Sequence, residues 1–268
     1  MQNKVIHHHS SGFWNHRYAL YNLVLKDFRV RYRNMSLGFL WSIINPLVML
    51  GVLLFVFTFV LKVSREPYFA VFLLIGQVLY NFMSLCLMTA TTCIKDNSSV
   101  VKKMIFPRTI IPVSVVLSQM IHLFIQLGLV VVFMIVMRVP LSLTMFWMPV
   151  IIIIETTFIL GAAMIASCLN VYFRDIRYLV ESGLTVFFWF TPIFYSLETA
   201  RDNLAPWMYN LYILNPLAGC IASARNVLLR QMQPDFKALG ISALVATFAF
   251  IFGLFLFNKL HKQFADNI

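Results

Sequence analysis

The chain has 268 residues, of which 60% are hydrophobic and only 12% are charged, whereas about a quarter of the residues of a typical soluble domain are charged. Its formal net charge of +11 comes from short clusters between long apolar blocks, which is typical of membrane topology signals and not of nucleic-acid binding. These quantities argue against a soluble domain and a nucleic-acid partner, and they predict an all-α integral membrane protein.

Residues 1–36 are predicted to be a cytoplasmic tail followed by an amphipathic helix, with no cleavable signal peptide. Within residues 15–33, Leu20, Val24 and Phe28 recur at helical spacing on one face, and cations occupy the opposite face. An apolar stripe opposed to cations is typical of a helix in the plane of the lipid headgroups. We therefore predict an interfacial helix that ends in the basic cluster Arg29, Arg31 and Arg33.

Residues 37–268 are predicted to form a six-span membrane domain. A spanning helix needs about 20 predominantly apolar residues. The predicted spans are residues 37–61, 69–92, 109–137, 146–170, 180–197 and 239–257. Residues 211–229 are long enough for a seventh span, but Arg225 lies within them, and a charge inside a span costs about 2.5–3.5 kcal/mol on insertion scales.

The distribution of cations favours an even number of spans. With six spans, 14 of the 21 Lys and Arg residues face the cytoplasm and seven face outward, as the positive-inside rule requires. Both termini are then cytoplasmic. Residues 198–236 become an external segment that dips into the membrane and returns, with Asn215 as the cap and Pro216 as the first residue of a short helix.

The third and fourth predicted spans carry polar side chains that could contact the substrate or a neighbouring helix. Ser114, Ser118, His122 and Gln126 follow one another at a spacing of four residues and form a polar stripe, which suits either a polar path or hydrogen bonds between helices. Glu155 lies near the middle of the fourth span. It suits either a proton or substrate contact or a structural hydrogen bond, because an ionised carboxylate there is costly.

The stretch FFWFTPIFYS, residues 187–196, places six aromatic residues around Pro192. One interpretation is an aromatic belt at the membrane interface. The other is a path for sugars, because aromatic faces stack on the C–H faces of sugar rings.

Two amphipathic loops are predicted on the cytoplasmic side. IKDNSSVVKKMIFPR, residues 94–108, has a helix-capping start followed by apolar residues beside lysines, and NVYFRDIRYLVES, residues 170–182, mixes aromatic and charged residues. Such loops suit either a plain surface or docking of a soluble partner by apolar anchors in a charged rim.

No enzyme or metal motif occurs in the sequence. The chain has no phosphate-binding loop of the Gly-x-x-x-x-Gly-Lys kind, no His-Glu-x-x-His and no Gly-x-Ser-x-Gly. The four cysteines form no CxxC pair and are interpreted as small buried residues. We therefore expect no catalytic activity, no cofactor and no metal site on this chain.

Five blocks in a fixed order resemble a known family. KDFRVRYRNMSLGFLWSIINPL, MIFPR, YFRDIRYLVESGL, FFWFTPIFYS and ILNPLAG are similar to those of the permease subunit of type-2 ABC exporters. The resemblance covers about residues 20–260 and points to the branch that exports O-antigen, capsule and teichoic acid polysaccharides.

The resemblance implies a homodimer in the bacterial inner membrane that works with two cytosolic subunits, which bind the ATP and Mg²⁺. The substrate would be a lipid-linked glycan. Arg29, Arg31 and Arg33 would meet the pyrophosphate of the lipid carrier, although they could also bind anionic membrane lipids. Residues implied to couple to the ATPase are Val100, Val101, Lys102, Met104, Ile105, Arg174 and Asp175.

The same resemblance implies that the passage is lined by Trp41, Asn45, Phe187, Phe188, Trp189, Phe190 and Tyr195. Asn45-Pro46 would bend a helix at this passage, and the carbonyl that Pro46 deprives of its partner would have to be satisfied locally. A drug or small-lipid exporter of the same fold, and a membrane-embedded glycosyl- or acyltransferase, are the alternatives to polysaccharide export.

Overall fold

The computed structural model describes residues 12–32, 38–62, 66, 68–99, 107–261 and 264. Within these ranges the chain is helical, with short connections. The first half contains α1 (Gly12–Tyr32), a 3₁₀ turn (Gly38–Leu40), α2 (Trp41–Leu54) with a π-helical continuation (Phe55–Val60), α3 (Phe69–Asp96) and α5 (Ile110–Val136). The second half contains a 3₁₀ turn (Leu143–Trp147), α6 (Met148–Tyr172), α7 (Ile176–Phe190), α8 (Leu197–Asn203), α9 (Pro206–Tyr212), α10 (Pro216–Arg225) with its π-helical continuation η4 (Asn226–Arg230), and α11 (Phe236–Leu260).

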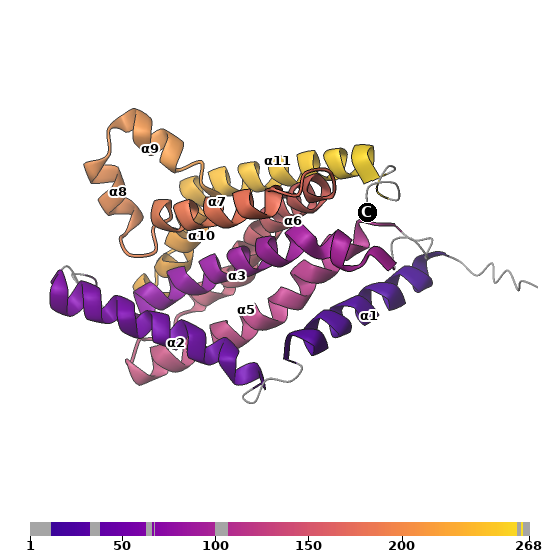
Figure 1. The fold of residues 1–268 in the computed structure, drawn as a ribbon. Helices are drawn as coiled ribbons and strands as arrows, with labels where there is room; N and C mark the ends of the chain where they lie inside the picture. Colours follow the sequence, from indigo (N-terminus) through magenta and orange to yellow (C-terminus); the bar gives the residue numbers. More distant parts are fainter. Residues whose placement is uncertain are drawn as a thin grey trace, which may run out of the picture.

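The long helices form one bundle. Figure 1 shows α3, α5, α6, α7 and α11 running lengthwise beside one another, with successive long helices alternating in direction. One end of the bundle carries α8 and α9, and we call it the α8–α9 end. The opposite end carries the end of α11 and the start of α1, and we call it the terminal end.

Helix α3 is the centre of the bundle. Every residue from Ala70 to Tyr80 is buried, and α3 packs against α2, α5, α6, α7 and α10. A helix that is apolar on all sides is stable only when other helices or lipid surround it. The neighbours of α3 therefore account for the apolar run in its first half.

Helices α6 and α11 form the closest helix pair, and two glycines account for it. A Cβ atom added at Gly253 of α11 would lie 2.5 Å from the carbonyl oxygen of Gly161 in α6. Small residues at a contact allow two helix backbones to approach and pack closely within a membrane.

Five helical segments are long and apolar enough to cross a membrane: Trp41–Val60, Phe69–Asp96, Ile110–Val136, Leu143–Tyr172 and Phe236–Leu260. The predicted span at residues 180–197 is not among them. The helix in that region, α7, has 15 residues and ends at Phe190. Because Pro192 disfavours helical backbone at the residue before it, Thr191 is extended, and the helix stops earlier than hydropathy predicts.

Polar caps begin several helices at the α8–α9 end. Asn215 accepts a hydrogen bond from the Leu217 N–H, and Pro216 is the first residue of α10, as the sequence predicts. Ser196 caps α8 through the Thr199 N–H. Asp235 caps α11 by accepting from two backbone N–H groups. Such caps satisfy donors that a helix start leaves unpaired.

Helix α1 packs along α5 (Figure 1). Leu23 is its most buried described side chain, at 9% exposure, and Leu20 and Val24 of the predicted stripe are half-buried. The packed face of α1 therefore includes the predicted Leu20 and Val24 and adds Leu23 beside them. The placement of α1 in the plane of the headgroups stays a prediction.

Candidate functional site

Pro46, which the sequence predicts to bend α2, lies with Ser42 at a polar junction between three helices. Pro46 is inside α2, and a proline has no N–H with which to bond the carbonyl four residues earlier, which belongs to Ser42. Gln126 of α5 donates its side-chain amide to this Ser42 carbonyl at 3.4 Å. Gln77 of α3 donates to the Pro46 carbonyl at 3.1 Å. The freed carbonyl is thus satisfied by a neighbouring helix.

The polar stripe of α5 also contributes hydrogen bonds to this junction. The Nδ1 atom of His122 lies 3.0 Å from the Ser42 hydroxyl, and both side chains are buried. Gln119 donates to the Thr89 hydroxyl of α3 at 3.3 Å. These contacts join α5 to α2 and α3, which fits the structural interpretation of the stripe. Trp41 and Asn45 lie on the same helix α2 and are exposed.

The aromatic residues near residue 190 divide into a packed set and an exposed set. Phe188 makes edge-to-face contacts with Tyr80 at 5.0 Å and with Phe194 at 5.1 Å between ring centroids. Phe187 is half-buried beside them. Trp189 and Phe190 are each 64% exposed. The sequence treats these residues as one group, whereas the structure gives them two environments.

A cavity of about 490 Å³ lies beside the exposed set, at the α8–α9 end. Trp189, Phe190, Tyr195 and Tyr212 provide its aromatic walls, and Asn203 provides an amide. The Tyr212 hydroxyl donates to the Tyr195 hydroxyl at 3.2 Å. Burial raises the pKa of Tyr212, and this hydrogen bond raises it further, so the phenol stays neutral. Aromatic faces with hydrogen-bonding groups at their edges suit an amphipathic ligand.

An ionic cluster ties three segments together at the same end. Arg230, at the end of η4, forms ion pairs with Glu198 of α8 and with Glu66 of the α2–α3 connection, the latter at 3.5 Å. Burial raises the pKa of Glu198, but the hydrogen bond and charge of Arg230 outweigh burial and hold that pKa below its ordinary value of 4.5. Burial alone would lower the pKa of Arg230, and the two glutamates raise it above its ordinary value.

At the terminal end, the structure describes only two of the residues predicted to couple to the ATPase. Arg174 and Asp175 are exposed in the turn between α6 and α7. Val100, Val101, Lys102, Met104 and Ile105 lie outside the described residues. The structure therefore gives no test of a coupling helix at these positions.

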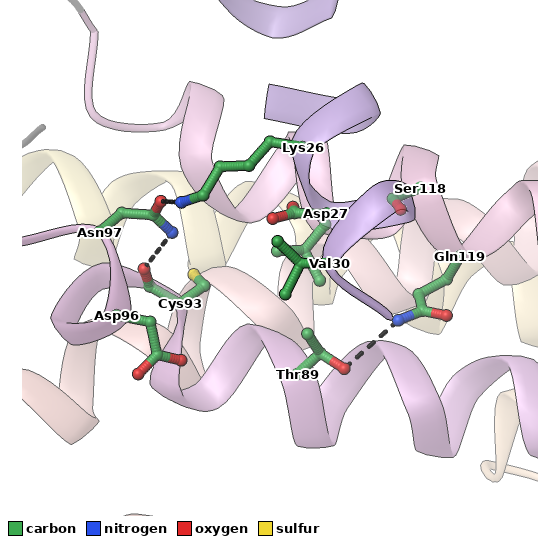
Figure 2. A pocket seen from close by; sticks show the side chains of 10 residues that line it. Lys26, Asp27, Val30, Thr89, Cys93, Asp96, Asn97, Ser118 and Gln119 are labelled. Carbon is green, nitrogen blue, oxygen red and sulfur yellow. Dashed lines mark hydrogen bonds between the residues drawn. The ribbon is translucent and has the colours of Figure 1, made fainter. Parts of the chain in front are cut away.

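Two of the three predicted pyrophosphate contacts, Arg29 and Arg31, belong to α1. Arg29 is exposed on this helix, while the Arg31 side chain and the whole of Arg33 lie outside the described part of the chain. Three residues earlier, the Lys26 ammonium donates to the Asn97 side-chain oxygen at 2.6 Å, and the Asn97 amide donates to the Cys93 carbonyl at 2.8 Å (Figure 2). These bonds attach α1 to the end of α3.

A cavity of about 530 Å³ lies between α1 and the facing parts of α3 and α5 (Figure 2). Lys26, Asp27 and Asp96 supply charges to its lining, and Val30 and Val115 supply apolar surface. The cavity therefore combines charged and apolar surface, as a lipid does, and it lies beside the part of α1 that carries Arg29.

Glu155 is fully buried, and neither of its carboxylate oxygens has a hydrogen-bond partner among the described residues. The predicted structural hydrogen bond to a neighbouring helix is therefore not formed by the described residues. The described part of the chain also holds no group of three or more His, Cys, Asp or Glu side chains that could bind a metal ion.

Arg225 has a binding role that its position in the sequence does not predict, although its charge argues against a seventh span. The structure buries its guanidinium, with 3% of the residue exposed, and surrounds it with backbone carbonyls. The sequence does place a single arginine in an apolar segment. Such an arginine indicates that neighbouring groups must stabilise its charge.

Comparison with known proteins places these features in a family. Residues 18–229 match the model of the membrane component of ABC-2 type transporters. Two O-antigen export system permease proteins RfbA of Klebsiella pneumoniae are each 31% identical to the chain over 242 residues, which cover 90% of this chain and 91% of the relative. The RfbA protein of Myxococcus xanthus is 28% identical over 259 residues, which cover 95% and 97%. The chain therefore belongs to the ABC-2 type transporter family, as a multi-pass membrane subunit.

Proposed function

We propose that this chain is the membrane subunit of an ATP-driven exporter that moves a lipid-linked polysaccharide of the O-antigen kind out of the bacterial cytoplasm. The observation that carries the proposal is the match, along nearly the whole chain, to three permeases of O-antigen export systems. The ATP and Mg²⁺ belong to separate ATPase subunits, because the 268 residues contain no phosphate-binding loop.

The proposed topology has six crossings, with the terminal end in the cytoplasm and the α8–α9 end outside. The alternating direction of the long helices in Figure 1 supports it, as does the ratio of 14 to seven cations. Helix α7 would be the fifth crossing. Its 15 residues span about 22 Å, less than the ~30 Å of a bilayer core, so the buried segment at 191–196 would complete the crossing.

The proposed passage lies between two copies of the chain. Helix α2 and the exposed set on α7 supply its walls, because both present large apolar side chains outside the packed bundle. In a passage, Trp189 and Phe190 would stack against sugar rings, while Trp41 and Asn45 of α2 would lie nearer the cytoplasm. Helices α8 to α10 would shape the outer mouth and re-enter the membrane at α10.

The lipid carrier is proposed to meet Arg29, Arg31 and Arg33. Arginine binds phosphate oxygens through two parallel hydrogen bonds, and a pyrophosphate offers several such oxygens. The bond from Lys26 to Asn97 supports this role, because it holds the arginine-bearing helix against the bundle.

The ATPase subunits are proposed to dock on residues 100–105 and on the turn at Arg174 and Asp175. Both segments follow helices that end at the terminal end, α3 and α6. Closure of the ATPase pair on ATP would then push the ends of these helices and open the passage.

Export is tested in cells that lack this chain. We expect the lipid-linked glycan to accumulate on the cytoplasmic side, the surface glycan to disappear, and both effects to reverse when the chain is restored. Normal surface glycan together with retention of a drug or a small lipid would favour the alternative exporter.

Docking is tested separately by Val101→Asp and Ile105→Asp, which place charge on the apolar anchors. We expect both variants to insert in the membrane and to lose co-purification of the ATPase subunit. Leu141→Asp, an equally drastic change at an exposed position near the other end, serves as the control and should retain the ATPase. Unchanged co-purification with both variants would contradict the docking surface.

A further inference from the structure

The segment Thr191–Ser196 follows α7 and leaves the helix geometry, and Thr191 and Ile193 are completely buried. The Thr191 and Ser196 carbonyls accept backbone N–H groups, whereas the carbonyls of Pro192, Ile193 and Tyr195 have no backbone partner among the described residues. Buried carbonyls without a partner are costly, particularly in a membrane. Something must therefore satisfy them, and the structure shows that one side chain does most of this.

Arg225 of α10 donates to three of these carbonyls. It reaches Pro192 at 2.6 Å, Ile193 at 2.7 Å and Tyr195 at 3.0 Å. Its Nε and one terminal nitrogen both donate to the Phe72 carbonyl in the first turn of α3, at 3.2 Å each. A guanidinium has five N–H groups, and all five are used. We call this arrangement the Arg225 clamp.

Packing around the clamp is equally specific. The guanidinium carbon lies 3.4 Å from the centroid of the Phe72 ring, within the range of a cation–π contact. Gly76 leaves the space that the clamp occupies, since a Cβ there would lie 2.8 Å from an Arg225 nitrogen and 3.2 Å from the Ile193 Cα. No described carboxylate lies within ion-pair distance of Arg225, so carbonyl dipoles stabilise its charge.

Asn215, which caps the start of α10, holds the first residue of the segment, Thr191. The Asn215 side-chain amide donates to the Thr191 hydroxyl at 3.1 Å, and that hydroxyl donates to the Phe187 carbonyl at 2.7 Å. Asn215 simultaneously caps α10 through its oxygen. The segment is therefore bonded to both ends of α10: Thr191 to Asn215 at the start, and the carbonyls of Pro192, Ile193 and Tyr195 to Arg225 at the end.

We propose that Arg225 and Asn215 are positioning residues that fix the outer end of α7 to α3 and α10, so that the aromatic side chains around residue 190 keep one arrangement during transport. The transport role rests on the proposed function. The clamp makes the segment, α10 and the start of α3 move as one body, and motion of α7 relative to them must occur nearer the terminal end.

The test measures local mobility in the purified exporter with its ATPase, in lipid nanodiscs. A spin label is attached at Phe190→Cys, and a control label at Phe255→Cys on α11, which is similarly exposed. The four native cysteines are buried and give little background. Arg225→Lys keeps the charge but supplies only three donors. Thr191→Val removes the Asn215 contact and leaves the cap of α10 intact, so it tests the clamp even if Arg225→Lys fails to fold.

We expect both variants to increase the mobility of the label at 190, about twofold or more for Arg225→Lys, without a change at 255. Export per ATP hydrolysed should fall about tenfold in Arg225→Lys, because the loss of one or two hydrogen bonds changes an equilibrium by about that factor. Unchanged mobility at 190 in both variants would overturn the proposal, and so would raised mobility with undiminished export per ATP. A parent exporter that moves no glycan would refute the proposed function, while the label at 190 would still decide whether the clamp exists.

Discussion

Pro46 shows how one missing N–H group determines the identity of a residue on another helix. The carbonyl of Ser42 loses its partner within α2, and Gln126 of α5 replaces that partner. Gln126 is almost fully buried, a position at which an apolar residue would be ordinary in a membrane helix. The glutamine is therefore explained by a proline that lies far away in the sequence.

A double substitution tests this dependence. Gln126→Leu should destabilise the protein by about 1–3 kcal/mol, because it leaves a buried carbonyl unsatisfied. In a Pro46→Ala background, the new N–H at residue 46 can bond the Ser42 carbonyl, so the same substitution should cost much less. Detergent-induced unfolding of the four proteins measures the coupling.

Gln119→Leu is the matched control, because Gln119 bonds Thr89 of α3 and not the carbonyl freed by Pro46. Its cost should be equal in both backgrounds. If Gln126→Leu also costs the same in the parent and in the Pro46→Ala background, the proline does not explain the glutamine.

At the scale of helices, the α6–α11 pair depends on Gly161 and Gly253. Gly253→Ala should separate the two backbones and destabilise the protein by about 1–3 kcal/mol, as overpacking does. Gly240→Ala, on the same helix α11 with open space around it, should be neutral or stabilising because alanine favours a helix. Thermal unfolding in detergent measures both. Equal stability of the two variants would show that the close approach is not required.

The ionic cluster at the α8–α9 end predicts a pH dependence. The pKa of Glu198 is lower in the folded protein than its ordinary value of 4.5. The folded state therefore gains stability from this group above pH 4.5 and loses it as the pH falls through the folded pKa. The gain should be no more than about 1 kcal/mol, because the pair is largely exposed.

The measurement compares the parent with Glu198→Gln over a range of pH. The parent should be more stable at neutral pH, and the difference should disappear in acid. Glu181→Gln, which replaces an exposed carboxylate on α7 outside the cluster, is the control for removal of one negative charge. A difference for Glu198→Gln that persists unchanged in acid would show that the pair does not stabilise α8.

Over the whole molecule, the sequence predicts the parts that depend on local pattern. Long apolar runs mark the five candidate spans, and Asn215-Pro216 marks the start of α10. The end of α7 was also open to prediction from Pro192, but continued hydropathy through residue 197 obscured it. On α1 the sequence does not predict the burial of Leu23, because the contact with α5 determines which residues beside the apolar stripe are covered.

The parts that could not be predicted depend on contacts between distant segments. Arg225 donates hydrogen bonds to carbonyls of α3 and of the segment after α7. The residues around Arg225 in the sequence do not predict these partners. Gln126 meets Ser42 for the same reason. Predicted contacts at Arg31, Arg33 and residues 100–105 lie beyond the described residues, so the coupling and pyrophosphate roles stay predictions.

The number of crossings is the property on which the orientation of the whole molecule depends, and α7 decides it. If α7 crosses, Arg177 at its start and Asp202 in α8 lie on opposite sides of the membrane. If α7 does not cross, they lie on the same side. Both residues are exposed, and the native cysteines are buried, so an engineered cysteine at either position reports alone.

We expect a membrane-impermeant thiol reagent to label Asp202→Cys in intact cells, and to label Arg177→Cys only after the cells are opened. Lys259→Cys, exposed at the end of α11, should behave like Arg177→Cys, because α11 returns the chain to the terminal end (Figure 1). Identical labelling of Arg177→Cys and Asp202→Cys, in intact cells or only after opening, would show that α7 does not cross and would reduce the crossings to five. If both were labelled in intact cells, Arg174 and Asp175 would also lie outside, where no ATPase could reach them, and the proposed coupling would fail with the topology.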